Sequence, residues 1–209
     1  MRYKIFRRAC ALFLGAALVG WGFVSPRLPT PWRVTLPAGV GGLLVLVTRA
    51  PLGLSPPRLW AGLRLGSAAG VVAVSAIAAT TLVPPVRLAM ADREPPAPVP
   101  DWLLLRIPVG TVWAEESAFR AALATAGSGA FGKAGGRLLQ AATFGLFHIA
   151  DARATSEPVV ATVLVTGIGG WLFGWLADHS GSLAAPILAH LAINEAGAIA
   201  ALTVRRRSA

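Results

Sequence analysis

Apolar runs alternate with short polar or proline-rich stretches along almost the whole chain. An α-helix needs roughly 20 apolar residues to cross a bilayer, so runs of this kind predict transmembrane helices. These apolar runs cover residues 9–24, 34–47, 66–90, 103–126, 159–177 and 182–204, and a further, shorter run ends at His148. The pattern predicts an all-α fold, a polytopic transmembrane bundle of about six to eight helices. It forms a single integral-membrane domain over residues 1–209.

Prolines, aromatic residues and charges mark the predicted helix boundaries. Residues 52–60 contain prolines, Trp and Arg and predict an interfacial connector. The prolines of residues 92–100 predict a loop outside the bilayer core. Asp101 is then the candidate N-cap of the next helix, which Pro108 is expected to kink. Residues 178–179, Asp-His, are expected in a solvated turn.

Composition supports a membrane location. The chain is 55% hydrophobic and 13% charged, whereas a soluble domain carries about 25% charged residues. Its net charge of +10 does not indicate a nucleic-acid partner, because the basic residues gather between apolar runs, where they face anionic lipid. We therefore expect a multi-pass protein of the plasma (cell) membrane. The single cysteine, Cys10, excludes an internal disulfide.

The basic residues 2–8 precede the first apolar run, an order that a signal peptide and a first transmembrane helix share. No small-x-small cleavage site follows, and Trp21 is typical of an interfacial helix end, so the helix is favoured, with a cytoplasmic N-terminus. About seven crossings would place the arginines at 205–207 on the far side, against the positive-inside bias. Six and eight crossings therefore remain alternatives.

Two adjacent carboxylates and an arginine interrupt the run 103–126. A charge near the bilayer centre costs at least about 2.5 kcal/mol, so an ionisable residue at that depth predicts a functional site. Glu116 and Arg120 are four residues apart and share one helix face, whereas Glu115 is rotated by about 100°. The spacing predicts that Arg120 neutralises Glu116 and leaves Glu115 free for chemistry.

Two later runs also carry polar groups at depth. Phe144 lies one turn before His148, and His190 and Asn194 share one face of the last run. Each could instead be a packed residue or a bond between helices, worth about 0.6 kcal/mol on average. Three separate runs with such costly groups are best explained together, by one polar cavity within the membrane.

A carboxylate, two histidines and an asparagine suit amide hydrolysis without a covalent intermediate. A carboxylate and a histidine that converge on one water can deprotonate it, while a second histidine and an amide can donate to the oxyanion. No serine or threonine lies beside a histidine in a nucleophile-and-base pattern. A catalytic zinc held by Glu115, His148 and His190 is the alternative, although the HExxH helix of soluble zinc proteases is absent.

Three spaced motifs resemble, in order and spacing, those of the CAAX prenyl endopeptidase and bacteriocin-processing family, an abortive-infection-like family of intramembrane proteases. The motifs are Glu115-Glu116-x-x-x-Arg120, Phe144-x-x-x-His148 and Ser182-Leu183-x-x-Pro186-x-x-x-His190-x-x-x-Asn194. The likeness covers about residues 103–194, inside a motif-bearing core at about 101–204. It implies a multi-span helical fold whose site opens into the bilayer.

The resemblance also implies a role for each motif residue. Glu115 activates water with His148, while His190 and Asn194 form the oxyanion site. Structural support comes from Glu116, Arg120 and Phe144. We expect catalysis without a cofactor, with zinc as the alternative.

The expected partner is a membrane-associated protein or peptide, either a prenylated CAAX-type substrate or one related to bacteriocins or sorting. A non-catalytic membrane scaffold or transporter is the competing interpretation of the same polar cluster. A transporter typically shows a repeat of hydropathy, and none is visible in the sequence.

Overall fold

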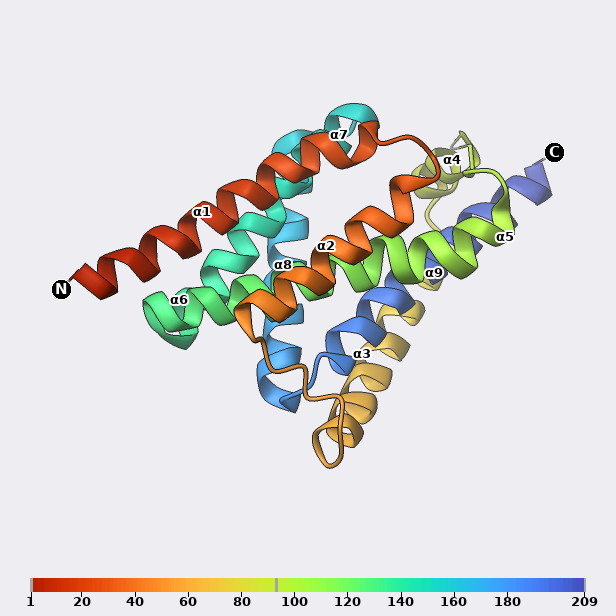
Figure 1. The fold of residues 1–209 in the computed structure, drawn as a ribbon. Helices are drawn as coiled ribbons and strands as arrows, with labels where there is room; N and C mark the ends of the chain where they lie inside the picture. The colour runs from red at the N-terminus through yellow and green to blue at the C-terminus, as the bar shows by residue number, and fades with distance from the viewer. Residues whose placement is uncertain (1, 93, 209) are drawn as a thin grey trace.

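The computed structural model describes residues 2–92 and 94–208, and within these ranges it contains helices and no strand (Figure 1). The all-α prediction is therefore confirmed. In chain order the elements are α1 (Arg2–Val24), η1 (Ser25–Arg27), α2 (Trp32–Thr48), α3 (Arg58–Thr80), α4 (Pro84–Asp92), α5 (Val99–Asp101), η2 (Trp102–Trp113), η3 (Glu116–Leu123), α6 (Ala124–Phe147), α7 (Ile149–Ala154), α8 (Val159–Ser180) and α9 (Ala184–Ser208).

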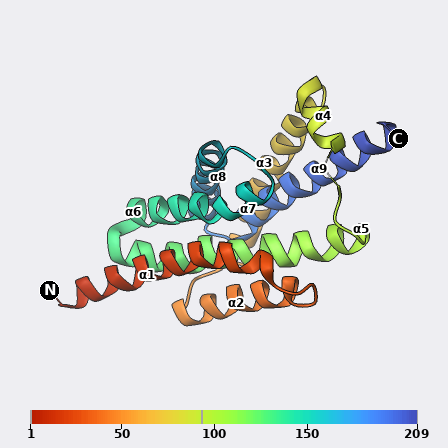
Figure 2. The same ribbon diagram turned by 90° about the horizontal axis from the view of Figure 1, so that it is seen from above.

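A long helix, residues 99–131, runs through the middle of the molecule, and we call it the central rod. It joins α5, η2, η3 and the start of α6, and η2 and η3 have the wide turns of a π-helix. Gly132 ends it with φ 78° and ψ 168°, a conformation that glycine adopts readily. The chain then returns beside the rod as the rest of α6 (Figure 2). Glu115 and His148 therefore lie on two arms of one hairpin.

The start of the central rod differs from the prediction. Pro98, with extended backbone angles, is the N-cap, and Asp101 lies inside the first turn without a capping hydrogen bond. The proline supplies the fixed backbone angle that begins the helix, so no side-chain cap is needed. Pro108 lies within η2.

Small residues let the other helices pack closely. Gly62, Gly66 and Gly70 lie one turn apart on α3, and a Cβ added at Gly66 would lie 2.8 Å from the Cα of Ala185 on α9. On α6, the side-chain amide of Gln140 donates to the carbonyl of Gly170 on α8 at 2.9 Å. Close backbone approach and buried side-chain bonds of this kind are typical of helix packing in membranes.

Four helical stretches are long and apolar enough to cross a membrane, and α2 is a shorter apolar helix. The four are Arg2–Arg27, Arg58–Thr80, Val159–Ser180 and Ala184–Arg207. Large apolar side chains such as Phe13, Leu104 and Val160 are exposed, as expected where lipid rather than water surrounds the protein. The chain is an integral membrane protein.

Two predicted boundaries were wrong. The connector expected at 52–60 is shorter, because α3 already begins at Arg58. Asp178 and His179 belong to the last turn of α8 rather than to a turn beyond it. There Asp178 pairs with Arg137 at 3.2 Å and His179 stacks on Trp175, so the helix continues by one turn.

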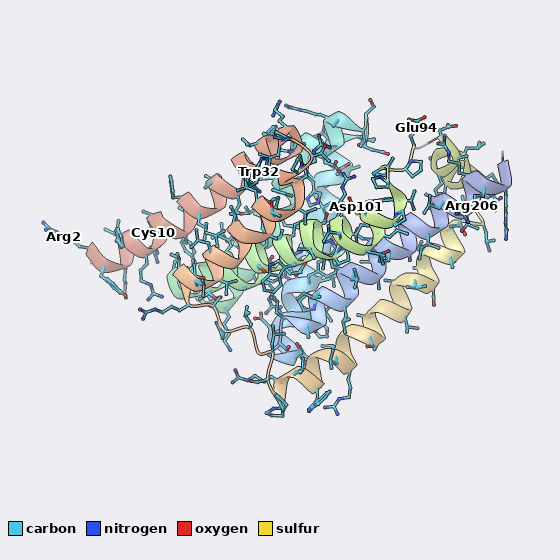
Figure 3. All side chains as sticks on the ribbon, turned by 45° about the vertical axis from the view of Figure 1, so that its right-hand side comes forward. Arg2, Cys10, Trp32, Glu94, Asp101 and Arg206 are labelled. Carbon is cyan, nitrogen blue, oxygen red and sulfur yellow. The ribbon has the colours of Figure 1, made fainter. Side chains whose placement is uncertain are left out.

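The basic ends of the chain lie far apart. Figure 3 shows Arg2 and Arg206 at opposite ends of the molecule, the latter near Glu94. Arg205 and Glu94 form an exposed ion pair at 4.0 Å. The charged groups at both ends thus flank the apolar middle of the bundle.

Candidate active site

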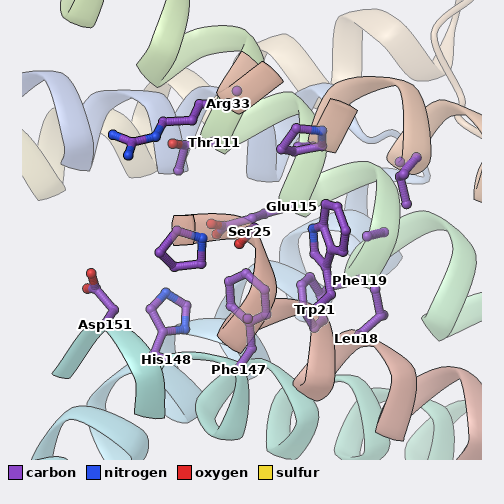
Figure 4. A pocket seen from close by; sticks show the side chains of 18 of the residues that line it. Leu18, Trp21, Ser25, Arg33, Thr111, Glu115, Phe119, Phe147, His148 and Asp151 are labelled. Carbon is purple, nitrogen blue, oxygen red and sulfur yellow. The ribbon is translucent and has the colours of Figure 1, made fainter. Parts of the chain in front are cut away.

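A cavity of about 510 Å³ lies against the central rod, between α1, α2, α7 and α9. All four residues that were predicted to be catalytic line this cavity: Glu115, His148, His190 and Asn194. Figure 4 shows Glu115 and His148 among the side chains around it. The structure therefore joins three separate apolar runs at one polar cavity.

Glu115 reaches the cavity from the central rod. Its side chain is 14% exposed, and its Oε2 lies 3.9 Å from Nε2 of His190. That separation is too long for a direct hydrogen bond, but one water can contact both atoms. Oε2 has no hydrogen-bond partner among the described residues. Because an unpaired buried polar atom is costly, this oxygen is a favourable position for a water or a substrate group.

Glu116 is fully buried and has two partners. Its Oε1 accepts a hydrogen bond from Nδ1 of His190 at 2.7 Å, and its Oε2 lies 3.4 Å from Nε of Arg120. The spacing predicted the second contact but not the first. Glu116 is therefore not satisfied within its own helix alone: it also orients a histidine of α9.

Arg120 is buried against aromatic rings. Its guanidinium carbon lies 3.8 Å from the centre of the Phe144 ring and 5.0 Å from that of Phe173. The negative faces of the rings attract the cation, an effect that grows when water is excluded. Phe144 thereby holds Arg120 against Glu116.

His148 ends α6 at the cavity. Its Nδ1 donates a hydrogen bond to the backbone carbonyl of Phe144 at 2.8 Å, and the two rings are 4.6 Å apart in a T-shaped arrangement. A proton fixed on Nδ1 leaves the Nε2 of the neutral ring as an acceptor. His148 therefore presents a base or acceptor to the cavity that Glu115 lines.

His190 and Asn194 come from α9. The His190 ring stacks on Phe173 at 5.0 Å, and its bond to Glu116 directs Nε2 toward Glu115. Asn194 follows one turn later and lines the same cavity. Of the two histidines, His190 is the one whose ring lies within 4.0 Å of Glu115 among the described contacts.

The residues named for a zinc ion do not form a metal-binding group. Among the described residues, no three His, Cys, Asp or Glu side chains lie together in a way that could hold a metal ion. Glu115, His148 and His190 line one cavity without converging on one point. We therefore derive no step through a metal, and catalysis without a metal remains a prediction, with zinc as its alternative.

Sequence reasoning missed other polar residues of the cavity. Arg33, Arg106, Thr111 and Asp151 also line it. Asp151 follows His148 by three residues and lies in the first turn of α7. Arg106 precedes Glu115 on the same rod, and its charge within an apolar run was an available signal.

Comparisons with known proteins agree with this geometry. The family model described as type II CAAX prenyl endopeptidase Rce1-like matches residues 98–196. That range begins at the N-cap of the central rod and extends past Asn194 on α9, so it contains every motif residue of the cavity. No curated protein and no solved structure matches the chain.

Proposed function

We propose that the chain is an intramembrane endopeptidase, because the family model described as type II CAAX prenyl endopeptidase Rce1-like matches residues 98–196, which contain every motif residue of the cavity. Its substrate is a membrane-associated protein or peptide with a CAAX-type C-terminus, in which a prenylated cysteine is followed by three residues. The hydrolytic water lies between Glu115 and the histidines of the cavity.

In the proposed reaction, Glu115 takes a proton from this water while the water oxygen attacks the carbonyl carbon of the scissile bond. The acceptor Nε2 of His148 orients the same water. The carbonyl oxygen becomes an oxyanion, which receives hydrogen bonds from the amide of Asn194 and from Nε2 of His190. For this step His190 is an imidazolium, with one proton on the Nδ1 that donates to Glu116 and a second on Nε2. The C–N bond then breaks, and the proton held by Glu115 passes to the leaving amine.

One observation carries the proposal. The 2.7 Å bond between Glu116 and His190 fixes the imidazole, and its other nitrogen lies 3.9 Å from Glu115. A carboxylate with a free oxygen thus faces a histidine whose orientation is set by a second carboxylate. Preorganised donors of this kind supply much of the stabilisation of an oxyanion.

The test uses the purified protein in liposomes and one membrane-anchored peptide that ends in Cys-Val-Ile-Met, with and without an S-farnesyl group. We expect cleavage after the cysteine, detected by mass spectrometry. Glu115→Gln should lower kcat by a factor of about 10²–10⁴, the usual contribution of a general base. Glu94→Gln is the matched control, because that carboxylate is 88% exposed and lies outside the cavity.

The outcomes separate catalysis from the competing interpretation. Cleavage that persists in both Glu115→Gln and His148→Ala would overturn the proposed site. If neither form of the peptide is cleaved and Glu115→Gln also preserves every cellular phenotype of the wild type, a scaffold or transporter is favoured. Cleavage of the farnesylated form alone would establish a prenylated substrate.

A further inference from the structure

Two arginines that have no role in the proposed reaction face the cavity. Arg33 comes from α2 and Arg106 from η2, and both line the cavity with Glu115 and Asn194. In the part of the chain that the structure describes, no carboxylate lies within 4.0 Å of either guanidinium. Arg33 is exposed and Arg106 is half-buried, so neither guanidinium is enclosed by protein and both are accessible to a ligand in the cavity.

The packing of α2 on η2 brings these arginines to the same part of the cavity. A Cβ added at Gly110 would lie 3.3 Å from the backbone oxygen of Arg33, so the two helices touch there. Arg106 precedes Gly110 by four residues and shares its helix face. The guanidinium of Arg33 is held by a bond from Nε to the carbonyl of Leu28 at 2.8 Å. Its two terminal NH₂ groups remain for a ligand.

The cavity is polarised along its length. Figure 4 shows Arg33 and Thr111 on one side of Glu115, and His148 and Asp151 on the other. A ligand that binds across Glu115 therefore meets cations at one end and an acidic and imidazole-bearing wall at the other. Guanidinium groups pair with planar carboxylates through two parallel hydrogen bonds, which selects an anionic group for the arginine end.

The separation of Arg106 and Gly110 from Glu115 along the rod limits how far the anionic group can lie from the scissile bond. Glu115 follows Gly110 by five residues and Arg106 by nine. At about 1.5 Å per residue, which the wide turns of η2 shorten, these levels lie at most about 7.5 and 13.5 Å from Glu115. An extended peptide of three residues spans about 10–11 Å. Its terminal carboxylate would therefore reach the two arginines.

We propose that Arg33 and Arg106 form a subsite for the free C-terminal carboxylate of the substrate and so set the position of cleavage about three residues from the end. The inference rests on the proposed function and extends it. The protein recognises a chain terminus, and internal peptide bonds of the same sequence are poor substrates. The competing role for these arginines is to anchor the helices at the membrane surface.

The first test compares one S-farnesylated peptide ending in Cys-Val-Ile-Met as the free acid, as the C-terminal amide, and extended by three residues. Wild-type protein in liposomes should cleave the acid faster than the amide by about tenfold to a hundredfold in kcat/KM, the range expected for a bond to a charged group. In Arg33→Gln/Arg106→Gln this ratio should fall toward one. Arg106→Lys should retain part of it. The control Arg64→Gln, an exposed residue of α3, should keep the wild-type ratio.

The second test measures binding in the Glu115→Gln background, where cleavage is expected to be slow enough for the bound peptide to be captured. Photo-crosslinking of the acid peptide should exceed that of the amide, and the excess should vanish in Arg33→Gln/Arg106→Gln. Wild-type protein that cleaves acid and amide equally would refute the subsite and leave the protease assignment intact. Arginine-dependent binding of the acid without cleavage by wild type would support the subsite and remove the protease assignment. Competition by vesicles rich in phosphatidylglycerol, with no preference between acid and amide, would assign the arginines to lipid.

Discussion

Glu116 is the residue on which the geometry of the cavity depends. It is fully buried and lies between His190 and Arg120. It accepts a hydrogen bond from His190 and neutralises the charge of Arg120. Arg120 in turn is enclosed by aromatic rings. The adjacent carboxylates therefore differ in environment: Glu115 keeps an oxygen without a partner, whereas Glu116 connects the central rod to α9.

Glu116→Gln should destabilise the fold, whereas Glu115→Gln should mainly remove activity. Loss of the Glu116 charge leaves Arg120 buried without its counter-ion, a change that typically costs about 3–5 kcal/mol. Thermal unfolding of both variants in detergent measures the difference, with the melting temperature of Glu115→Gln expected to stay close to that of the wild type. Equal melting temperatures for the two variants would contradict the division of roles.

The sequence predicted the contact of Glu116 with Arg120, within one helix, but not its contact with His190 on a distant helix. The pairing of Glu116 with Arg120 follows from a separation of four residues on one helix. The bond from His190 spans 74 residues, and periodicity carries no information about which face of one helix meets which face of another. Arg33 was missed for the same reason, because the packing of α2 against the central rod, at Gly110 and at other positions, brings it to the cavity.

At the level of elements, α3 positions α9. Gly62, Gly66 and Gly70 form a side-chain-free face on α3 against which α9 packs, and α9 carries His190 and Asn194. Nothing on α3 lines the cavity. Its influence on the site therefore acts through the placement of α9.

Gly66→Leu should disturb both stability and catalysis. A Cβ at this position would lie 2.7 Å from the backbone oxygen of Ala185, so α9 has to shift. Overpacking of this kind usually costs about 1–3 kcal/mol, and displacement of His190 should lower kcat. Gly39→Leu on α2 is the control, because a Cβ there meets nothing within 4 Å. A wild-type melting temperature and kcat for Gly66→Leu would show that α3 does not position α9.

Helix existence followed from the apolar runs, but helix ends did not. The run 66–90 divides into α3 and α4, and the helix that contains the run 103–126 continues to Gly132, where the chain turns back in a hairpin. Asp101 was misplaced because a proline with suitable backbone angles can begin a helix without a side-chain cap. Where two residues could each begin a helix, packing decides which of them does, and the sequence pattern contains no information on packing.

The whole molecule surrounds a polar cavity with an apolar exterior. Composition predicted the membrane location, since so few charged residues remain to face water. The number of membrane crossings was harder to predict from the sequence. Among the described residues, four helices are long and apolar enough to cross a membrane. The central rod, with its charges and its hairpin, is not among them, although a span was predicted at 103–126.

Catalysis should proceed without a metal ion. On the proposed assignment, the carboxylate and histidines of the cavity supply the base and the oxyanion donors that hydrolysis needs, and among the described residues no three His, Cys, Asp or Glu side chains are grouped so as to hold a metal ion. We expect cleavage to persist after treatment with EDTA and with 1,10-phenanthroline, and elemental analysis to find less than one zinc per chain. Stoichiometric zinc whose removal abolishes cleavage, and whose return restores it, would establish the zinc alternative.

The hairpin at Gly132 has a consequence for biosynthesis. Its two arms bring Glu115 and His148 together from a single stretch of chain, while His190 and Asn194 arrive with α9, after α8 has been made. On the proposed assignment, a nascent chain that has inserted through α7 holds its water-activating groups but has no oxyanion donors. On this assignment, the chain has no proteolytic activity until α9, the last helix made, docks against α3. The growing chain and its neighbours in the membrane are therefore not exposed to an active protease during synthesis.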